Sequence, residues 1–309
     1  MGKVPVLGTV SLAYGFLLGE LGTIFRLVWA PLLAGAWLSY FYGGQAMDAA
    51  IAAGVNADPA TAMTYAPVQF VIGIVTFVTG IMASVALFQV VLFGDRKPGL
   101  YFYLWLGAAE GRLILVTILL VIAVLAGAFA LSLVLGMLGA IAVAAPAMGL
   151  VAFVGAIAAF VASIWAACRL MLVSAVVVAE NNLGVERSWA ITRGNALRML
   201  AIFILIFGPY VLVAGFLFVA VMGSDLPAFP ASPEFVPADG GKENTAAMQA
   251  FAKAIEAWQL DLMKGMRMHW LEITVLGFAG NLVTTALWAG AMGSAYRSLA
   301  GERAQSSAE

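Results

Sequence analysis

This chain of 309 residues carries very little charge, because Asp, Glu, Lys and Arg together make up only 10% of it. A typical soluble domain contains roughly 25%. Hydrophobic residues account for 63% of the chain and the mean hydropathy is +1.02. Water cannot cover so much apolar surface, so we expect lipid to be the solvent. The net charge of −1 gives no reason to expect a nucleic-acid partner.

Cysteine and histidine are almost absent, which removes most of the chemistry that enzymes use. The single cysteine, Cys168, excludes an internal disulfide and a CxxC metal site, and we expect it to be a packing residue. The single histidine, His269, stands in "MHWLE", with no second histidine to complete a zinc site. The sequence contains no GxSxG, Walker or GxGxxG motif. We therefore expect no catalytic activity, no metal and no cofactor.

The chain contains long runs without a charged residue, and each run is a candidate membrane span. The runs cover residues 27–47, 59–94, 113–168, 199–224 and 273–296. A span needs about 20 apolar residues, so the run 113–168 is too long for one helix, and we place a turn at Ala144-Ala145-Pro146. Glu20 and Arg26 interrupt the first apolar stretch, so we expect no cleavable signal. The prediction is an all-α integral membrane protein, a single membrane domain over residues 1–309, with six transmembrane helices at about 22–42, 66–94, 113–140, 147–179, 199–222 and 270–296.

The distribution of Lys and Arg predicts the orientation of these spans. The loops 43–65 and 141–146 contain no basic residue, whereas the second and fourth loops are basic. The fifth loop, 223–269, mixes both signs, but long loops obey the rule poorly. We expect the second and fourth loops and both termini to be cytoplasmic. The basic residues that carry this prediction are Lys3, Arg96, Lys97, Arg112, Arg187, Arg193, Arg198, Arg297 and Arg303.

Three arginines suggest an internal repeat. Arg26, Arg112 and Arg198 are each 86 residues apart, and each begins a hydrophobic helix after a short segment with aromatic residues and glycine. Such segments are typical of interfacial helices. We predict three tandem two-helix units, each preceded by a short interfacial helix, at about 10–97, 98–185 and 186–300.

The outer loop 223–269 begins with a Pro-rich stretch and continues into a predicted amphipathic helix. Its apolar positions recur at spacings of three and four residues, while Gln249, Lys253 and Glu256 face away. The helix is expected either to lie on the membrane or to cap the bundle or a partner. The apolar positions are Met248, Phe251, Ile255, Trp258 and Leu262.

The stretch "VVVAENNLGVERSWAITRGNALRMLAIFIL" (residues 176–205), here called the signature segment, concentrates polar residues between two hydrophobic helices. It resembles the glycerophosphoryl diester phosphodiesterase membrane-domain family, with Ile191 where leucine is usual. The resemblance implies a polytopic bacterial inner-membrane protein. It does not extend to the catalytic phosphodiesterase domain, because no segment with its metal-binding residues is present. The matching residues are Glu180, Ser188, Trp189, Thr192, Gly194, Asn195 and Arg198.

Arginines dominate the candidate binding residues, and Arg169 is the most unusual because it lies about ten residues inside the fourth predicted span. It is expected either to snorkel or pair with Glu180 or Glu110, or to bind an anionic headgroup or substrate. Arg112, Arg187, Arg193 and Arg198 are further candidates for lipid or anion contact, since interfacial arginines attract anionic headgroups.

Two functions remain open from the residues. The first is a non-catalytic membrane module that engages lipid or another membrane protein, or forms a homo-oligomer. The alternative is a transporter or permease for a lipid-like or small anionic substrate, which Arg169, the repeat and the expected kinks at Pro31 and Gly208-Pro209 would suit. Asn281, Thr284 and Thr285 share one face of the last span, where we expect cross-helix hydrogen bonds.

Overall fold

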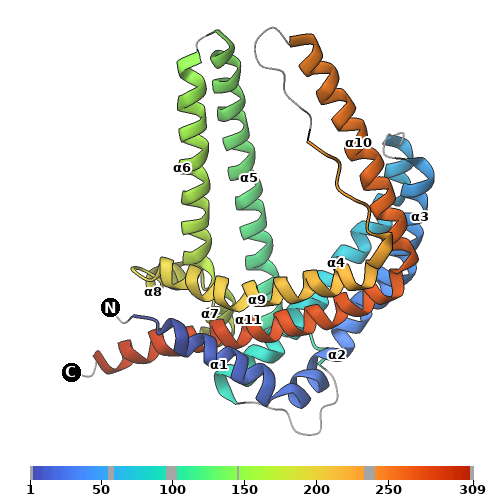
Figure 1. The fold of residues 1–309 in the computed structure, drawn as a ribbon. Coiled ribbons are helices and arrows are strands. Elements are labelled where there is room, and N and C mark those ends of the chain that lie inside the picture. The colour runs from blue at the N-terminus through green and yellow to red at the C-terminus, as the bar shows by residue number, and fades with distance from the viewer. Residues whose placement is uncertain (1–2, 55–58, 95–102, 145, 233–240, 307–309) are drawn as a thin grey trace. The chain divides into compact units, whose positions relative to one another are not determined.

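The computed structural model describes residues 3–54, 59–94, 103–144, 146–232 and 241–306 (Figure 1). Every regular element in these ranges is helical. Six helical segments are long and apolar enough to cross a bilayer, which confirms the predicted all-α membrane protein with six spans. They are Leu21–Ala53, Ala66–Phe93, Ala108–Val134, Gly149–Glu180, Ala196–Asp225 and Trp270–Gly301.

The first span is longer than predicted. The helix α2 (Leu21–Leu38), the π-helical turn η1 (Ser39–Gly43) and α3 (Gly44–Ala53) follow one another without a break. The predicted loop 43–65 is therefore wrong over α3, whose alanine-rich sequence has high helix propensity. Gly54 ends the helix with a φ of 74° and a ψ of 173°, a backbone conformation that essentially only glycine adopts.

The long uncharged run divides into two helices as predicted, since α5 (Ala108–Ala144) ends and α6 (Pro146–Leu170) begins at the predicted place, while residue 145 between them lies outside the described residues. Pro146 suits the first position of a helix, where its missing N–H has no intrahelical role. The two helices run antiparallel, side by side (Figure 1). The fourth predicted span, 147–179, is not one straight helix, because a two-residue turn separates α6 from α7 (Val173–Glu180).

The contacts divide the chain into two compact units. Unit 1 comprises Met1–Ala30, Gly80–Pro209 and Val283–Glu309, and unit 2 comprises Pro31–Thr79 and Tyr210–Leu282. The helices α2 and α9 (Ala196–Met222) continue through Pro31 and Pro209, and two of the four boundaries between the units fall at these prolines.

The core of unit 1 is formed where α1 (Val6–Gly19) and the second part of α4 (Pro59–Phe93) meet the second part of α11 (Trp270–Ser306). Glycines allow a close approach of the backbones. A Cβ at Gly290 would lie 3.0 Å from the Ala13 Cα, and one at Gly293 would lie 2.5 Å from a methyl of Val91. Small residues at helix contacts are typical of membrane proteins, where packing rather than water exclusion drives association.

Two of the three predicted interfacial segments are helical. The 14 residues of α1 are too few to cross a bilayer at 1.5 Å per residue, and α8 (Val185–Ile191) precedes α9. The segment before α5 differs, because residues 103–107 form no helix. The Glu110 carboxylate explains this local structure, since it accepts hydrogen bonds from the Tyr103 hydroxyl at 2.6 Å and the Gly107 N–H at 2.9 Å. The threefold repeat itself stays a prediction.

Unit 2 is built around the contact of η1 and α3 with the end of α10 (Gly241–Met268) and the start of α11. The Arg267 guanidinium donates to both carboxylate oxygens of Asp48, at 2.6 and 2.9 Å. This hydrogen bonding raises the pKa of the Arg267 guanidinium above its ordinary value. The indole N–H of Trp270 donates to the Tyr40 carbonyl at 2.9 Å, which supplies a partner for a backbone group in the π-helical turn.

The helix α10 confirms that a long helix follows the Pro-rich stretch. The predicted apolar positions are half-buried except for Met248, which is exposed. Trp258 contacts the Phe229 ring at 5.2 Å between centroids, and its indole N–H donates to the Pro227 carbonyl at 3.1 Å. The Pro-rich stretch therefore covers part of the apolar face of α10, and the far end of α10 packs against α3. The two predicted placements, on the membrane or as a cap on the bundle or a partner, both stay predictions.

Candidate functional site

The signature segment forms α7, α8 and the start of α9, all within unit 1. Two residues in left-handed conformation shape the connection between α7 and α8: Asn181 with φ 59° and Gly184 with φ 73°. A Cβ at Gly184 would also lie 3.1 Å from the Val176 side chain and 3.2 Å from the Val173 carbonyl oxygen. Glycine is therefore required at this position for both conformation and space.

Arg169 lies in the last turn of α6 and is only 6% exposed. Its Nε donates to the Trp189 carbonyl and to the Thr192 hydroxyl, both at 3.2 Å, and its Nη2 also donates to the Trp189 carbonyl. The guanidinium carbon lies 4.4 Å from the ring centroid of Trp189 and 5.1 Å from that of Trp165. These distances define cation–π contacts with both indoles.

These contacts correct the predicted partners of Arg169. Glu180 pairs with Arg187 instead, and Glu110 accepts from Tyr103 and Gly107. The reason lies in the turn after α6, which places the Arg169 side chain against α8. The Arg169 guanidinium donates to a backbone carbonyl and lies over an indole ring of the signature segment, and it does not pair with a carboxylate of the described residues.

The same turn leaves the Arg169 carbonyl without the helical partner that a continuous helix would supply. Two hydroxyls of the signature segment replace that partner. The Ser188 Oγ lies 3.0 Å and the Thr192 Oγ1 lies 2.9 Å from the Arg169 carbonyl oxygen. Both hydroxyl residues are completely buried. These two signature residues therefore stabilise the break between α6 and α7.

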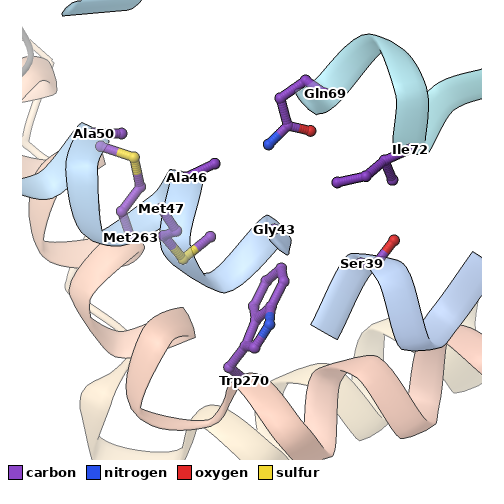
Figure 2. Close-up of a pocket in the computed structure, with 9 residues that line it drawn as sticks. All are labelled: Ser39, Gly43, Ala46, Met47, Ala50, Gln69, Ile72, Met263 and Trp270. Carbon is purple, nitrogen blue, oxygen red and sulfur yellow. The ribbon is translucent and has the colours of Figure 1, made fainter. Parts of the chain in front are cut away.

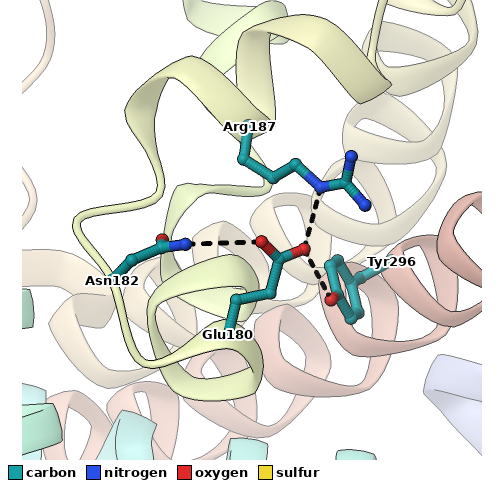
Figure 3. A network of polar contacts seen from close by, with 4 residues as sticks. All are labelled: Glu180, Asn182, Arg187 and Tyr296. Atoms are coloured by element: carbon teal, nitrogen blue, oxygen red, sulfur yellow. Dashed lines mark hydrogen bonds and ion pairs between the residues drawn. The ribbon is translucent and has the colours of Figure 1, made fainter.

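A second cluster joins the signature segment to α11, as Figure 3 shows. The Glu180 carboxylate accepts from the Arg187 Nε at 2.9 Å, from the Tyr296 hydroxyl at 2.9 Å and from the Asn182 amide at 3.4 Å. In Figure 3 the two terminal nitrogens of Arg187 point away from Glu180. The ion pair therefore uses one edge of the guanidinium and leaves the other edge available.

The start of the chain is held by the end of the signature segment. The Val4 N–H donates to the Asn195 Oδ1 at 3.2 Å, and the Val4 carbonyl accepts from the Arg198 Nη1 at 2.9 Å. Val4 is fully buried and Asn195 is 2% exposed. Asn195 and Arg198 therefore both bind the backbone of Val4. These two hydrogen bonds link the segment before α1 to the start of α9.

The other arginines predicted to contact lipid or anions differ in the hydrogen bonds that they make within the protein. The Arg112 Nη2 donates to the Asn181 Oδ1, which connects α5 to the left-handed residue after α7. Arg193 is exposed, and its guanidinium has no hydrogen-bond partner among the described residues. Gly194 next to it has a φ of 78°, so the signature glycine supports the turn before α9. Within the described part of the chain, Arg187 and Arg198 each use one nitrogen and Arg193 uses none, so all three signature-segment arginines have donors left over.

The signature segment also exposes apolar side chains close in sequence to these arginines. Leu183 is 42% exposed, Trp189 is 37% exposed and Leu197 is 80% exposed. Exposed leucine and tryptophan beside arginine is the composition expected at a membrane surface, where apolar groups reach the acyl boundary and guanidinium groups reach headgroups.

Sequence reasoning missed several residues of this region, including Asn181, Trp165 and Val4. Tyr296 stands beside Arg297 at the end of the last span, but nothing in the sequence pointed to its partner. In the structure its hydroxyl donates to the Glu180 carboxylate. Trp165 carried no signal, since a tryptophan in an apolar helix is usual in a membrane protein.

The described residues contain no group of three potential metal ligands. His269 lies 3.0 Å from Asp225 through its Nε2, in unit 2. Comparison of the chain with protein-family models, curated proteins and solved structures finds no match. The described contacts of the site residues are therefore the basis for the functional argument.

Proposed function

We propose that this multi-pass membrane protein is a non-catalytic module that binds anionic phospholipid headgroups through the exposed face of the signature segment. The supporting observation is that this segment combines guanidinium groups that have donors left over, at Arg187, Arg193 and Arg198, with exposed apolar side chains, at Leu183, Trp189 and Leu197. Each basic residue near an anionic surface contributes about 1 kcal/mol of attraction.

The attachment of the segment supports this function. The contacts of Arg169, Tyr296 and Val4 hold the signature segment from three other parts of the chain. A binding surface held in this way loses less conformational entropy when lipid binds. The proposal places the segment at the cytoplasmic face of a bacterial inner membrane, with both termini on that side, as the positive charges of the connections suggest. The likeness to the phosphodiesterase membrane-domain family is part of the same proposal.

The transporter alternative has less support. It was motivated in part by Arg169, whose donors are directed to Trp189 and Thr192 within the protein. Its remaining support is the repeat and the prolines within α2 and α9.

Native mass spectrometry of the purified protein tests the proposal by comparing bound phosphatidylglycerol with phosphatidylcholine. We expect Arg193→Ala to weaken phosphatidylglycerol binding about fivefold and to leave phosphatidylcholine binding unchanged, because one charge is lost. Arg193→Lys should retain most of the affinity.

The matched control is Lys253→Ala, which removes one exposed positive charge from α10. It should leave phosphatidylglycerol binding unchanged. The proposal fails if Arg193→Ala and Lys253→Ala have equal effects, or if the protein binds both lipids equally well.

A further inference from the structure

Unit 2 contains a cavity of about 330 Å³ that the signature segment does not use (Figure 2). This volume lies within the range of roughly 300–1,000 Å³ that is usual for small-molecule sites. The cavity lies among η1, α3, α4 and the junction of α10 with α11, and its walls are mostly apolar. The lining residues are Ser39, Gly43, Ala46, Met47, Ala50, Gln69, Ile72, Met263 and Trp270.

Trp270 forms a well-held wall of this cavity. Its indole N–H is fixed by the Tyr40 carbonyl at 2.9 Å. A Cβ at Gly43 would lie 3.1 Å from the indole, and one at Gly44 would lie 3.2 Å from it. The two glycines therefore leave space for the ring, and the hydrogen bond to Tyr40 fixes its orientation.

Two polar groups face the cavity without a hydrogen-bond partner among the described residues: the Ser39 hydroxyl and the Gln69 carboxamide. Figure 2 shows both polar ends directed toward the open space. A carboxamide can both donate and accept, and a hydroxyl can do the same. An apolar cavity with a few convergent polar groups is the usual form of a ligand site.

Charge is missing from the lining, which restricts the class of ligand. The nearby ion pair of Arg267 and Asp48 satisfies itself through two hydrogen bonds. A charged headgroup in the cavity would lose hydration without gaining a counter-charge. The lining therefore favours a neutral ligand that carries a hydroxyl or an ester.

Met47 and Met263 can pack against the apolar part of the ligand, because flexible thioether side chains adapt to irregular apolar shapes. The cavity also adjoins membrane spans: η1 and α3 belong to the first span, and Gln69 lies near the start of the second. We propose that unit 2 binds a neutral, monoacylglycerol-like molecule, with its hydroxyl or ester at Ser39 and Gln69 and its chain between the methionines and Trp270.

Photolabelling of the full-length protein in lipid nanodiscs tests this proposal. The probe is a monoacylglycerol with a diazirine in its acyl chain, and labelled peptides are identified by mass spectrometry. We expect labels in α3 and α10. Gln69→Leu should raise the half-saturating probe concentration about fivefold to tenfold, because it removes a hydrogen bond to the ligand. Ala46→Phe should abolish labelling by filling the cavity.

The matched control is Gln45→Leu, at an exposed glutamine of α3 outside the cavity lining, which should bind as the wild type does. Equal effects of Gln69→Leu and Gln45→Leu, or undiminished labelling of a folded Ala46→Phe variant, would overturn the site. If Ala46→Phe does not fold, the two glutamine variants decide. Equal labelling by a diazirine fatty acid of the same chain length, present as its anion, would overturn the neutral class of ligand.

Discussion

Replacing Arg169 by methionine should destabilise unit 1 strongly, although the new side chain suits an apolar helix. The substitution removes donors to the Trp189 carbonyl and the Thr192 hydroxyl and both cation–π contacts. Hydrogen bonds to a charged group contribute about 1.5–3 kcal/mol, and a partly buried cation–π contact contributes about 0.5–2 kcal/mol. Relief of the desolvation of a buried charge offsets part of this sum.

The expected net loss is about 2–4 kcal/mol in the free energy of unfolding. Arg169→Lys should lose about half as much, because an ammonium keeps the charge but cannot reproduce the planar fork of donors. The measurement is equilibrium unfolding of the purified protein in mixed detergent micelles. Arg193→Met is the matched control, and its effect should stay within about 0.5 kcal/mol because Arg193 is exposed.

A double-mutant cycle of Arg169→Met with Thr192→Val isolates the contact between the two side chains. Since the side chains share a hydrogen bond, we expect a coupling energy of at least about 0.5 kcal/mol. A loss below about 0.5 kcal/mol for Arg169→Met, or additive effects in the cycle, would refute the stabilising role of this cluster.

Three further results are expected. Tyr296→Phe should cost about 1 kcal/mol in unfolding free energy, because it removes the hydroxyl that donates to Glu180; an unchanged thermal midpoint would contradict this role. Gly184→Ala should cost at least about 1–2 kcal/mol through its left-handed φ, whereas Gly111→Ala in α5, where a Cβ meets nothing within 4 Å, should be neutral or stabilising. Reporter fusions after residue 190 should be active only in the cytoplasm, and activity on the outer side would disprove the proposed orientation.

The spans could be predicted because hydropathy is a sum over consecutive residues. The break between α5 and α6 was predictable from Pro146 and from the length of the uncharged run. The continuation of the first span through α3 was missed, because glycine and Asp48 resemble a loop when their partners are unknown. In the structure Arg267 neutralises Asp48, and Gly43 and Gly44 provide space for Trp270.

The signature segment was recognisable, but its internal roles were not. Ser188, Thr192 and Asn195 were selected from the family resemblance, yet nothing local showed that two of them donate to the Arg169 carbonyl and the third holds Val4. The charge of Arg169 suggested a carboxylate partner. The turn after α6 directed it to Trp189 instead.

The amino-acid sequence by itself determined that the chain is helical, has six apolar segments of membrane-spanning length and gathers arginines in particular connections. Each of these properties depends on the order of neighbouring residues. The tertiary structure alone decided which arginines are occupied and which are available, and it created the cavity beside Trp270. Both depend on residues far apart in the chain, such as Val4 with Asn195 and Asp48 with Arg267, whose contacts arise only when the helices pack.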